Sequence, residues 1–591
     1  MTNCFSILPL SKLLSYIDFE NAQKPILGIP DELIFNPVDR RLFTERYGKT
    51  LHIPLGVAAG PHTQLAQNIV SAWLCGARYI ELKTVQTLDE LEISKPCIDA
   101  SDEAYNCEWS QELKINESFD QYLNAWIIIH LIAHKRGLDN IGTIFNMSAG
   151  YNLEGILKDN MQWFFSKMKN CKIEKEEKLN SITAKYPWVQ DVVIPDCISD
   201  NITLSTMHGC PPDEIENIAN YLLNNLKLHT TVKLNPTLLG KQEVNEIISK
   251  SGFNIKVPDS AFEHDLKYHE AVEIIKNLDK NAKSSNLNFG VKLTNTLETL
   301  NIKKVLPSTE KTHYMSGRAL HPIGVKLALM LQQEFKGELD ISFSAGADCY
   351  NFPELIACNL QPVTVCTDIL KPGGYFRLKQ YSENLIDELN KTKSESISDY
   401  ISSKSGLKNK NEAIIENLKN YLGHVLDNDY YKFNQFKETN IKTDRTLNFF
   451  DCINAPCVDN CPTNQDIPSY MYFTSQKEYN KALEVITETN PFPNVTGKIC
   501  DHPCQLKCTR MNYDEPLKIR EIKRFVSESA VRESKAATPK NRINVSVIGA
   551  GPSGLSCAYY LSKKGVNVTI YEKKSYSGGM VQSVIPAFRL S

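Results

Sequence analysis

Short runs of apolar, β-favouring residues alternate with helical patterns over most of the first 380 residues. Eight of these runs are expected to be strands: 53–58, 79–83, 141–146, 202–206, 231–235, 289–295, 339–344 and 362–367. Helical periodicity fills most of the gaps, as in 64–75, 119–136, 212–226 and 319–335. Continuous apolar strands separated by helices indicate a parallel sheet. Eight such units predict an α/β fold, a closed (β/α)8 TIM barrel over residues 1–385.

The pattern changes after the barrel. Residues 386–445 are charged and rich in Lys, Asn and Ser, so we expect a solvated helical linker with one packed helix near 411–426. Residues 446–538 hold a dense group of cysteines and predict a small helical metal domain. Residues 539–591 begin with an apolar strand and a glycine-rich turn, which predict the start of a Rossmann-like domain.

Composition narrows the class of protein. Hydrophobic residues make up 42% of the chain, enough for large cores. The net charge is −3, with 66 basic and 69 acidic residues mixed throughout, which gives no reason to expect a nucleic-acid partner. The most apolar run, 126–133, is too short to span a membrane. Free thiols and the absence of a basic leader predict a cytoplasmic protein.

Polar residues or glycines close the predicted strands. Barrel enzymes place their sites at these carboxyl ends. Any one of these residues could be an ordinary turn residue, but two lysines and two asparagines at strand ends of one barrel favour a function. In chain order the candidates are Gly60, Lys83, Thr84, Asn146, Ser205, Thr206, Lys233, Asn295, Thr296, Ser344, Gly346 and Thr367.

Five segments of the barrel resemble the FMN barrel of dihydroorotate and dihydropyrimidine dehydrogenases: PLGVAAG (54–60), ELKT (81–84), VKLNP (232–236), LTNT (293–296) and SGRALHP (316–322). In that family, strand-end lysines and asparagines hold the flavin ring and the substrate. The resemblance therefore implies that Lys83, Lys233, Asn295 and Thr296 bind FMN or substrate. The Tyr151-Asn152 pair matches a substrate contact more weakly.

Two positions depart from that family. Its acid/base residue, a Cys or Ser after the fourth strand, is matched here by Thr206, whose pKa is far from 7. Cys210 and His208 are the alternatives in the same loop. The phosphate loop after the seventh strand keeps a single glycine, Gly346, to let backbone amides approach a phosphate. FMN is therefore a possible cofactor of the barrel.

Six cysteines lie within 57 positions of the metal domain: Cys452, Cys457, Cys461, Cys500, Cys504 and Cys508. Their grouping predicts an iron–sulfur site. Structural zinc is the first alternative, but its cysteines usually form one closed tetrahedral site. Disulfides are the second, and they require an oxidising compartment.

The metal domain resembles the iron–sulfur domain of the glutamate synthase small subunit and of dihydropyrimidine dehydrogenase, in CINAPC (452–457), CPT (461–463), NPFP (490–493) and TGKIC (496–500). The resemblance implies two [4Fe–4S] clusters, one on Cys452, Cys457 and Cys508 and the other on Cys461, Cys500 and Cys504. The fourth ligand of each differs, because Phe449 and Lys523 occupy the matching positions. Either another ligand completes each cluster or one cluster forms.

The last segment contains a dinucleotide-binding motif. Gly549, Gly551 and Gly554 follow an apolar strand and open a helix, and Glu572 comes 23 residues after Gly549. The glycines would let a pyrophosphate approach the helix N-terminus, and Glu572 would bind ribose hydroxyls. Residues 578–579 and 585–589 resemble the FAD domain of the glutamate synthase small subunit. About 50 residues are too few for that domain, so we expect an incomplete FAD site and a nicotinamide domain downstream.

The order of the three parts resembles a family named for the FAD/iron–sulfur subunit of selenate reductase. The resemblance implies an oxidoreductase that takes electrons from NAD(P)H at FAD, passes them through [4Fe–4S] clusters and reduces a small substrate in the barrel, or runs in reverse. Partner redox subunits are an additional expectation. One alternative is a non-catalytic electron-transfer scaffold whose barrel binds no flavin. A zinc-stabilised binding protein is another.

Overall fold

The computed structural model describes residues 7–17, 19, 25–88, 97–100, 103–107, 113–205, 210–302, 306–371, 373–433, 455–512, 515–531 and 543–590. Contacts divide the chain into two compact units, one of residues 1–439 with 512–514 and one of the remaining residues. Four residues discussed above, Thr206, His208, Phe449 and Cys452, lie outside the described residues.

The first unit contains a closed barrel of eight parallel strands, as predicted. The strands follow one another around the barrel in chain order, and the last closes against the first. They are β3 (Leu55–Val57), β4 (Tyr79–Glu81), β7 (Ile144–Gly150), β8 (Asn201–Ser205), β9 (His229–Leu234), β10 (Phe289–Leu293), β13 (Ile341–Phe343) and β14 (Val363–Val365).

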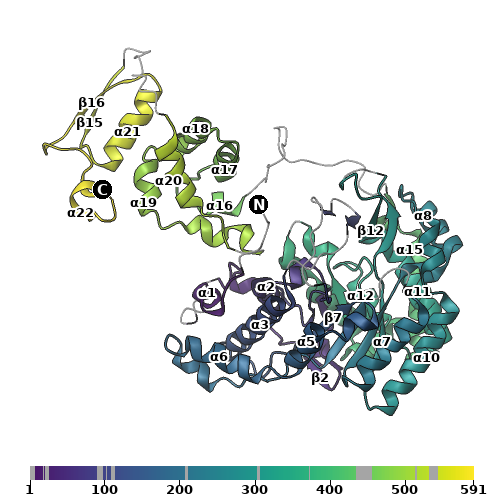
Figure 1. Ribbon diagram of the computed structural model, residues 1–591. Coiled ribbons are helices and arrows are strands. Elements are labelled where there is room, and N and C mark those ends of the chain that lie inside the picture. The colour runs from purple at the N-terminus through teal and green to yellow at the C-terminus, as the bar shows by residue number, and fades with distance from the viewer. Residues whose placement is uncertain are drawn as a thin grey trace. The chain divides into compact units, whose positions relative to one another are not determined.

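Helices cover the outside of this barrel (Figure 1). Their buried faces and the strands form one hydrophobic core, which includes Trp73, Tyr122, Phe145 and Phe343. The helices between the strands are α2 (Ala66–Leu74), α3 (Ile115–Lys135), α4 (Leu153–Ile156), α5 (Asp159–Lys169), α6 (Lys172–Thr183), α7 (Pro212–Asn224), α8 (Lys241–Ser251), α9 (Asp259–His264), α10 (Tyr268–Ser284), α11 (His321–Glu334) and α12 (Phe352–Ala357). Helix α1 (Leu10–Ser15) precedes them.

Two small antiparallel sheets were not predicted. One consists of β5 (Ile98–Asp99), β6 (Ala104–Asn106), β11 (Leu297–Leu300) and β12 (Thr312–Ser316), in the order β11-β12-β6-β5. Its strands belong to the segments that follow β4 and β10, so it stands at the carboxyl end of the barrel. The other is the hairpin of β1 (Thr44–Arg46) and β2 (Lys49–Leu51). These strands are too short for a periodic pattern, and β6 pairs with a strand about 200 residues later.

The segment expected to be a solvated linker instead packs on the barrel as far as residue 433. It forms α13 (Arg377–Thr392), α14 (Ile397–Ser405) and α15 (Lys410–Asp427), whose apolar faces join the barrel core. Asn417 of α15 donates hydrogen bonds to the carbonyls of Ala357 and Ile401, at 2.7 and 2.9 Å. Charged residues occupy the outer faces only, which is why composition alone suggested a linker.

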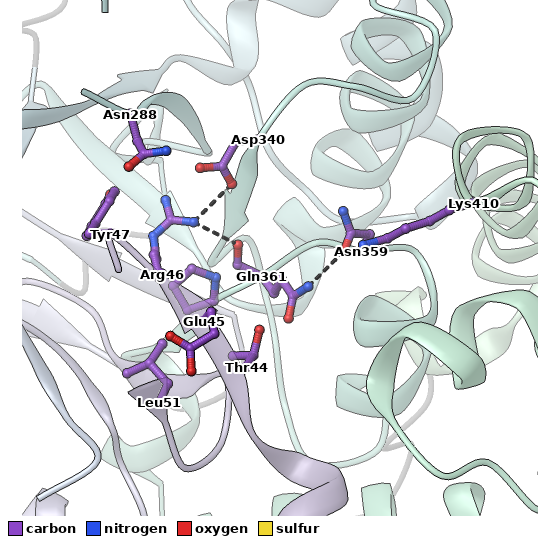
Figure 2. A pocket seen from close by; sticks show the side chains of 11 residues that line it. Thr44, Glu45, Arg46, Tyr47, Leu51, Asn288, Asp340, Asn359, Gln361 and Lys410 are labelled. Carbon is purple, nitrogen blue, oxygen red and sulfur yellow. Dashed lines mark hydrogen bonds and ion pairs between the residues drawn. The ribbon is translucent and has the colours of Figure 1, made fainter. Parts of the chain in front are cut away.

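A polar pocket of about 410 Å³ lies at the amino ends of the strands, beside the β1–β2 hairpin (Figure 2). Arg46 points across it, pairs with Asp340 at 2.9 Å and contacts the carbonyl of Gln361. Its guanidinium also lies 4.7 Å from the ring centre of Tyr47. Arg46 thus fastens the hairpin to this end of the barrel. Barrel sites form at the other end.

The second unit begins with a helical domain that has its own small core, centred on Ile467, Tyr470, Ile486 and Val526. Its helices are α16 (Pro456–Asp459), α17 (Ile467–Ser475), α18 (Tyr479–Thr489), α19 (Pro493–Ile499) and α20 (Ile519–Ser529), with 3-10 turns η11 (Pro503–Lys507) and η12 (Thr509–Asn512). This confirms the predicted helical domain.

The final segment forms β15 (Asn544–Ile548), α21 (Pro552–Lys563), β16 (Asn567–Tyr571) and α22 (Met580–Val584). Strands β15 and β16 pair in parallel, and α21 lies between them in the sequence. This is the predicted βαβ unit. Across the helices that the structure describes, none combines the length and apolar character needed to cross a membrane.

Candidate functional site

Two lysines stand side by side at the carboxyl end of the barrel. Strands β9 and β10 pair so that Lys233 lies opposite Lys292. Lys292 is 1% exposed and forms an ion pair with Glu81 of β4, which is 2% exposed. Its ammonium also donates to the hydroxyl of Thr364 at 2.8 Å. Like charges on adjacent strands are destabilising, so this arrangement requires compensating anionic groups, and Glu81 supplies one of them.

Burial and the neighbouring charges alter the protonation of these lysines. Burial, together with the charge of Lys292, lowers the pKa of Lys233 to about 8. The charge of Lys83 contributes to the same shift, so Lys83 shares this environment although it belongs to the end of another strand. Lys83 itself is 3% exposed. A group of cations in a poorly hydrated barrel mouth suits an anionic or electron-rich ligand.

A thiol and an imidazole lie beside the lysines. Cys366 follows β14, and its Sγ is 3.8 Å from Nδ1 of His62. Burial raises the pKa of Cys366 to about 11, although Lys233, Lys292 and Lys83 all act to lower it. Burial lowers the pKa of His62 to about 4, so its imidazole is neutral near pH 7. Both groups are therefore uncharged near pH 7.

Several buried polar atoms at this end of the barrel have no hydrogen-bond partner among the described residues. Four of them lie on the barrel strands or just after them: Oε1 of Glu81, Nε2 of His62, Oδ1 of Asn235 and Oγ1 of Thr294. Buried polar atoms are rarely left unpaired in proteins. Their concentration at the strand ends, among three lysines, fits a polar planar group such as a flavin ring or an amide-containing substrate.

The residues expected from the sequence to bind a flavin differ in what their side chains contact. The structure places Lys83 and Lys233 in one electrostatic environment, and their role in flavin binding stays a prediction. Asn295 uses its side-chain oxygen locally, because Oδ1 accepts from the backbone N–H of Thr296 at 3.0 Å. Thr84 pairs with Ser148 at 2.8 Å between their hydroxyl oxygens. A side chain at Gly60 would place its Cβ 2.8 Å from the ring of His62, so glycine is needed there.

Gly346 lies in the loop where a phosphate was expected. Its φ is +59°, and a Cβ there would lie 2.4 Å from the carbonyl oxygen of Gly317. Gly317 in turn lies against Thr367, whose hydroxyl is 3.0 Å from that of Ser316. The loops after β12, β13 and β14 therefore meet closely, and only glycine fits at two of the contact points. Gly346 is therefore explained by close packing between these loops.

Two other candidates have structural roles that the sequence did not indicate. Asn146 lies within β7 rather than at its end, donates to Asn201 at 2.7 Å and accepts from Thr203 at 2.7 Å. Asn152 caps α4, with its Oδ1 accepting from the N–H of Gly155 at 2.9 Å.

Cys210, an alternative acid/base residue, lines a small cavity together with Lys233, Asn235 and Asp265. Burial raises the pKa of its thiol to about 11, and the nearby Glu214 and Asp213 add to the shift. Cys210 is therefore near the lysines but protonated at neutral pH.

Sequence reasoning missed Lys292, Glu81, Cys366 and His62. A signal for Lys292 was present, because the tripeptide Val-Lys-Leu occurs at both 232–234 and 291–293. A lysine inside an apolar strand needs a partner. No local pattern identifies that partner, since Glu81 is 211 positions away in the chain.

In the second unit, five of the six predicted metal ligands lie within the described residues. Burial raises the pKa of Tyr470, and the neighbouring Cys504, Cys461, Cys457 and Cys500 raise it further. Tyr470 and Cys504 share one core cluster, and Cys457 and Cys461 pack against it. Backbone N–H groups donate to two sulfurs, from His502 to Cys500 at 3.3 Å and from Leu517 to Cys508 at 3.4 Å. Grouped soft thiols with N–H donors fit an iron–sulfur centre.

Within the described ranges, no three side chains of His, Cys, Asp or Glu converge on one point that could hold a single metal ion.

The glycine-rich turn has the geometry of a dinucleotide site. A Cβ at Gly554 would lie 2.0 Å from the carbonyl oxygen of Gly549, whereas a Cβ at Gly551 would meet nothing within 4 Å. Gly554 thus permits the close packing of α21 on β15, and the space beside Gly551 is open to a ligand. Glu572 accepts from the N–H groups of Ala550 at 2.7 Å and Lys574 at 2.9 Å, which ties β16 to the turn.

Comparison with family models divides the chain into three parts. The model described as "Oxidoreductase YgfK, N-terminal TIM-barrel domain" matches residues 27–425. The model for dihydropyrimidine dehydrogenase domain II, with its 4Fe-4S cluster, matches 427–535. A model of an NAD(P)-binding Rossmann-like domain matches 547–586.

Individual relatives agree with this division. An oxidoreductase named YgfK from Escherichia coli (strain K12) is 41% identical over 619 aligned residues, covering 99% of this chain and 57% of the relative. The NADPH-Fe(3+) oxidoreductase subunit beta of Geobacter sulfurreducens (strain DL-1 / KN400) is 38% identical over 147 residues, which are 24% of this chain and 22% of that protein.

Among solved structures, dihydroorotate dehydrogenase (DHODH) from Eimeria tenella matches 64% of this chain and 94% of its own, at 16% identity and a TM-score of 0.40, a likeness too low to bear on function. This chain spans 57% of the length of the YgfK relative. With a family model matched over most of its length and every predicted barrel strand present, the chain belongs to the YgfK oxidoreductase family.

Proposed function

We propose that this protein is a flavin- and iron–sulfur-dependent oxidoreductase whose barrel reduces or oxidises a small substrate. Electrons enter from NAD(P)H by way of FAD, with the glycine turn and Glu572 as part of the dinucleotide site. They pass through one or two [4Fe–4S] clusters held by the cysteines, and partner redox subunits can act as further donors or acceptors. The flow can also run in reverse.

The observation that carries the barrel assignment is the set of lysines and unpaired buried polar atoms at the strand ends. Bound FMN would supply the hydride and electron chemistry there. Lys83 and Lys233 provide positive charge where reduction places negative charge, and Lys292 forms an ion pair with Glu81. Asn235 and Thr294 have unpaired oxygens that can orient a substrate.

Cofactor analysis of the anaerobically purified full chain tests this proposal. We expect iron, acid-labile sulfide and FMN, with a brown colour from the clusters. Zinc in stoichiometric amount without sulfide would refute the iron–sulfur assignment and favour a zinc-stabilised binding protein.

Lys233→Ala distinguishes a flavin site from a merely structural lysine. The folded variant should lose FMN or substrate-dependent reoxidation while its melting temperature stays within a few degrees of wild type. If the variant unfolds, or if the wild-type barrel holds no FMN, the scaffold function takes the place of the enzyme. The single glycine of the phosphate loop, between the buried Ala345 and Ala347, is the observation that favours the scaffold.

Selenate reduction is the narrower form of this function. The resemblance of the domain order to a selenate reductase subunit supports it. The reduced holoprotein should then be reoxidised faster with selenate than in buffer alone. Absence of such reoxidation would remove selenate as the substrate and leave the general oxidoreductase proposal intact.

A further inference from the structure

Helix α20 carries a lysine into the interior of the metal domain. Lys523 is 6% exposed although it is a lysine on an 11-residue surface helix. The helix is held tightly, because a Cβ at Gly497 of α19 would lie 3.0 Å from the Cα of Arg524. The position of Lys523 is thus fixed by backbone packing one residue away, and its side chain is not a loose surface group.

The groups on the buried side of α20 include the cysteines. Lys523 belongs to the buried face of this helix together with Ile519 and Val526. Those two side chains share a core cluster with Cys504, and Cys461 packs against that cluster. Among the described residues, the ion pairs of α20 are those of Arg520 with Glu521 and of Arg524 with Glu528, and neither involves Lys523. A buried ammonium is costly unless an anion lies close by. The thiolate sulfurs are the groups that can meet this need.

The same face of α20 also holds the cysteine loop through Arg520. Its Nη1 donates to the carbonyl of Cys500 at 3.0 Å, and its backbone N–H donates to the side chain of Gln505 at 3.3 Å. Arg520 therefore has a structural partner and a balancing carboxylate, whereas Lys523 contributes an unbalanced positive charge beside the sulfurs.

We propose that Lys523 is the buried counter-cation of the iron–sulfur centre bound by Cys461, Cys500 and Cys504, and that it makes this centre easier to reduce. The inference rests on the iron–sulfur part of the proposed function. The reduction potential of a protein-bound cluster depends on net charge, hydrogen bonds to sulfur and exposure to solvent. A fixed positive charge stabilises the reduced form, which carries one more negative charge. Lys523 thus tunes the centre without serving as its ligand.

The test is a redox titration of the cluster-loaded full chain, followed by electron paramagnetic resonance. Lys523→Met keeps the length of the side chain and removes the charge. We expect at least a tenfold loss in the reduction equilibrium, which is a midpoint lower by about 59 mV for one electron. Lys518→Met, at the exposed start of the same helix, is the matched control and should leave the midpoint unchanged. Lys523→Arg should stay near wild type.

An unchanged midpoint in Lys523→Met, or an equal shift in Lys518→Met, would overturn the inference. If Lys523→Met does not retain its cluster, the iron and sulfide contents of Lys523→Met and Lys523→Arg are compared. A cluster retained in Lys523→Arg alone shows that a cation is required at this position and supports the inference. A cluster lost from both variants shows that Lys523 acts through packing and overturns the inference. Wild-type protein without iron or sulfide would instead refute the proposed function itself, so the two failures are distinguishable.

Discussion

At the scale of single residues, the barrel is notable for buried charges that balance one another across distant strands. Lys292 and Glu81 are both almost fully buried and come from β10 and β4. Such a pair adds little net stability over an apolar pair of similar size, but breaking it leaves an uncompensated charge. Lys292 is therefore sensitive to substitution in a way that surface lysines are not.

Lys292→Met should destabilise the barrel by about 3–5 kcal/mol, because it leaves Glu81 buried without its partner. Urea unfolding followed by circular dichroism measures the change. Lys276→Met is the matched control, since Lys276 pairs with Glu334 at 2.7 Å on the surface. The control should cost at most about 1 kcal/mol. Equal effects of the two variants would show that the buried pair has no special role.

Lys233 should make barrel stability depend on pH. Its pKa falls from 10.5 to about 8 on folding, so the folded state binds the proton less tightly than the unfolded state. Between pH 8 and 10.5 the unfolded chain then holds more protons, and stability rises with pH. Relative to Lys233→Met, wild type should gain up to about 3 kcal/mol over this window. If the difference in unfolding free energy between wild type and Lys233→Met stayed constant from pH 8 to 10.5, the lowered pKa of Lys233 would be contradicted.

At the scale of elements, glycines mark the places where helices, strands and loops approach most closely. The β15–α21 turn separates two such uses. Gly554 is required by the fold, because a Cβ there would overlap the carbonyl of Gly549, while Gly551 borders open space. Open space beside a glycine, as at Gly551, is expected where a pyrophosphate comes near the backbone.

Gly551→Ala and Gly554→Ala should therefore fail in different ways. Gly551 has φ of −77°, which alanine adopts freely, so Gly551→Ala should fold normally and bind FAD or NAD(P)H more weakly. Gly554→Ala should disturb the βαβ unit itself. Hydrogen exchange of the β15 and β16 amides, compared with dinucleotide titration, separates the two. Normal dinucleotide binding by Gly551→Ala would place the ligand elsewhere.

At the scale of the whole molecule, two compact units have separate hydrophobic cores. The barrel core is extensive, whereas the core of the metal domain rests on a few residues around Tyr470. Small domains of this kind usually depend on a metal for stability. Stability should therefore be divided unequally between the units.

Calorimetry of the cluster-loaded protein should show two transitions. Removal of iron should lower or abolish the transition of the metal domain and leave the barrel transition within a few degrees, because metal-binding free energy is folding free energy for a small domain. Lys292→Met should have the opposite effect and move the barrel transition. A single transition that responds to both changes would contradict independent units.

The sequence by itself determined the features that repeat along the chain or concentrate within a short segment. Eight apolar runs specify the barrel, because each strand buries both faces and alternates with a helix. The glycine turn and the cysteine group follow from spacing, since a βαβ turn and a thiol-rich site are built from residues close in the chain. Lys83 and Lys233 could be recognised because each closes an apolar strand.

The tertiary structure decided which charges meet. Glu81 and Lys292 become partners, and Cys366 reaches His62, only because the closed barrel brings β10 and β14 near β4 and β3, which come early in the sequence. Asn146 proved to be part of an interior hydrogen-bond network, and residues 386–433 proved to pack on the barrel, since polarity alone does not tell an outer helix face from a linker. Long-range pairing is set by chain closure and burial, and neither leaves a local pattern in the sequence.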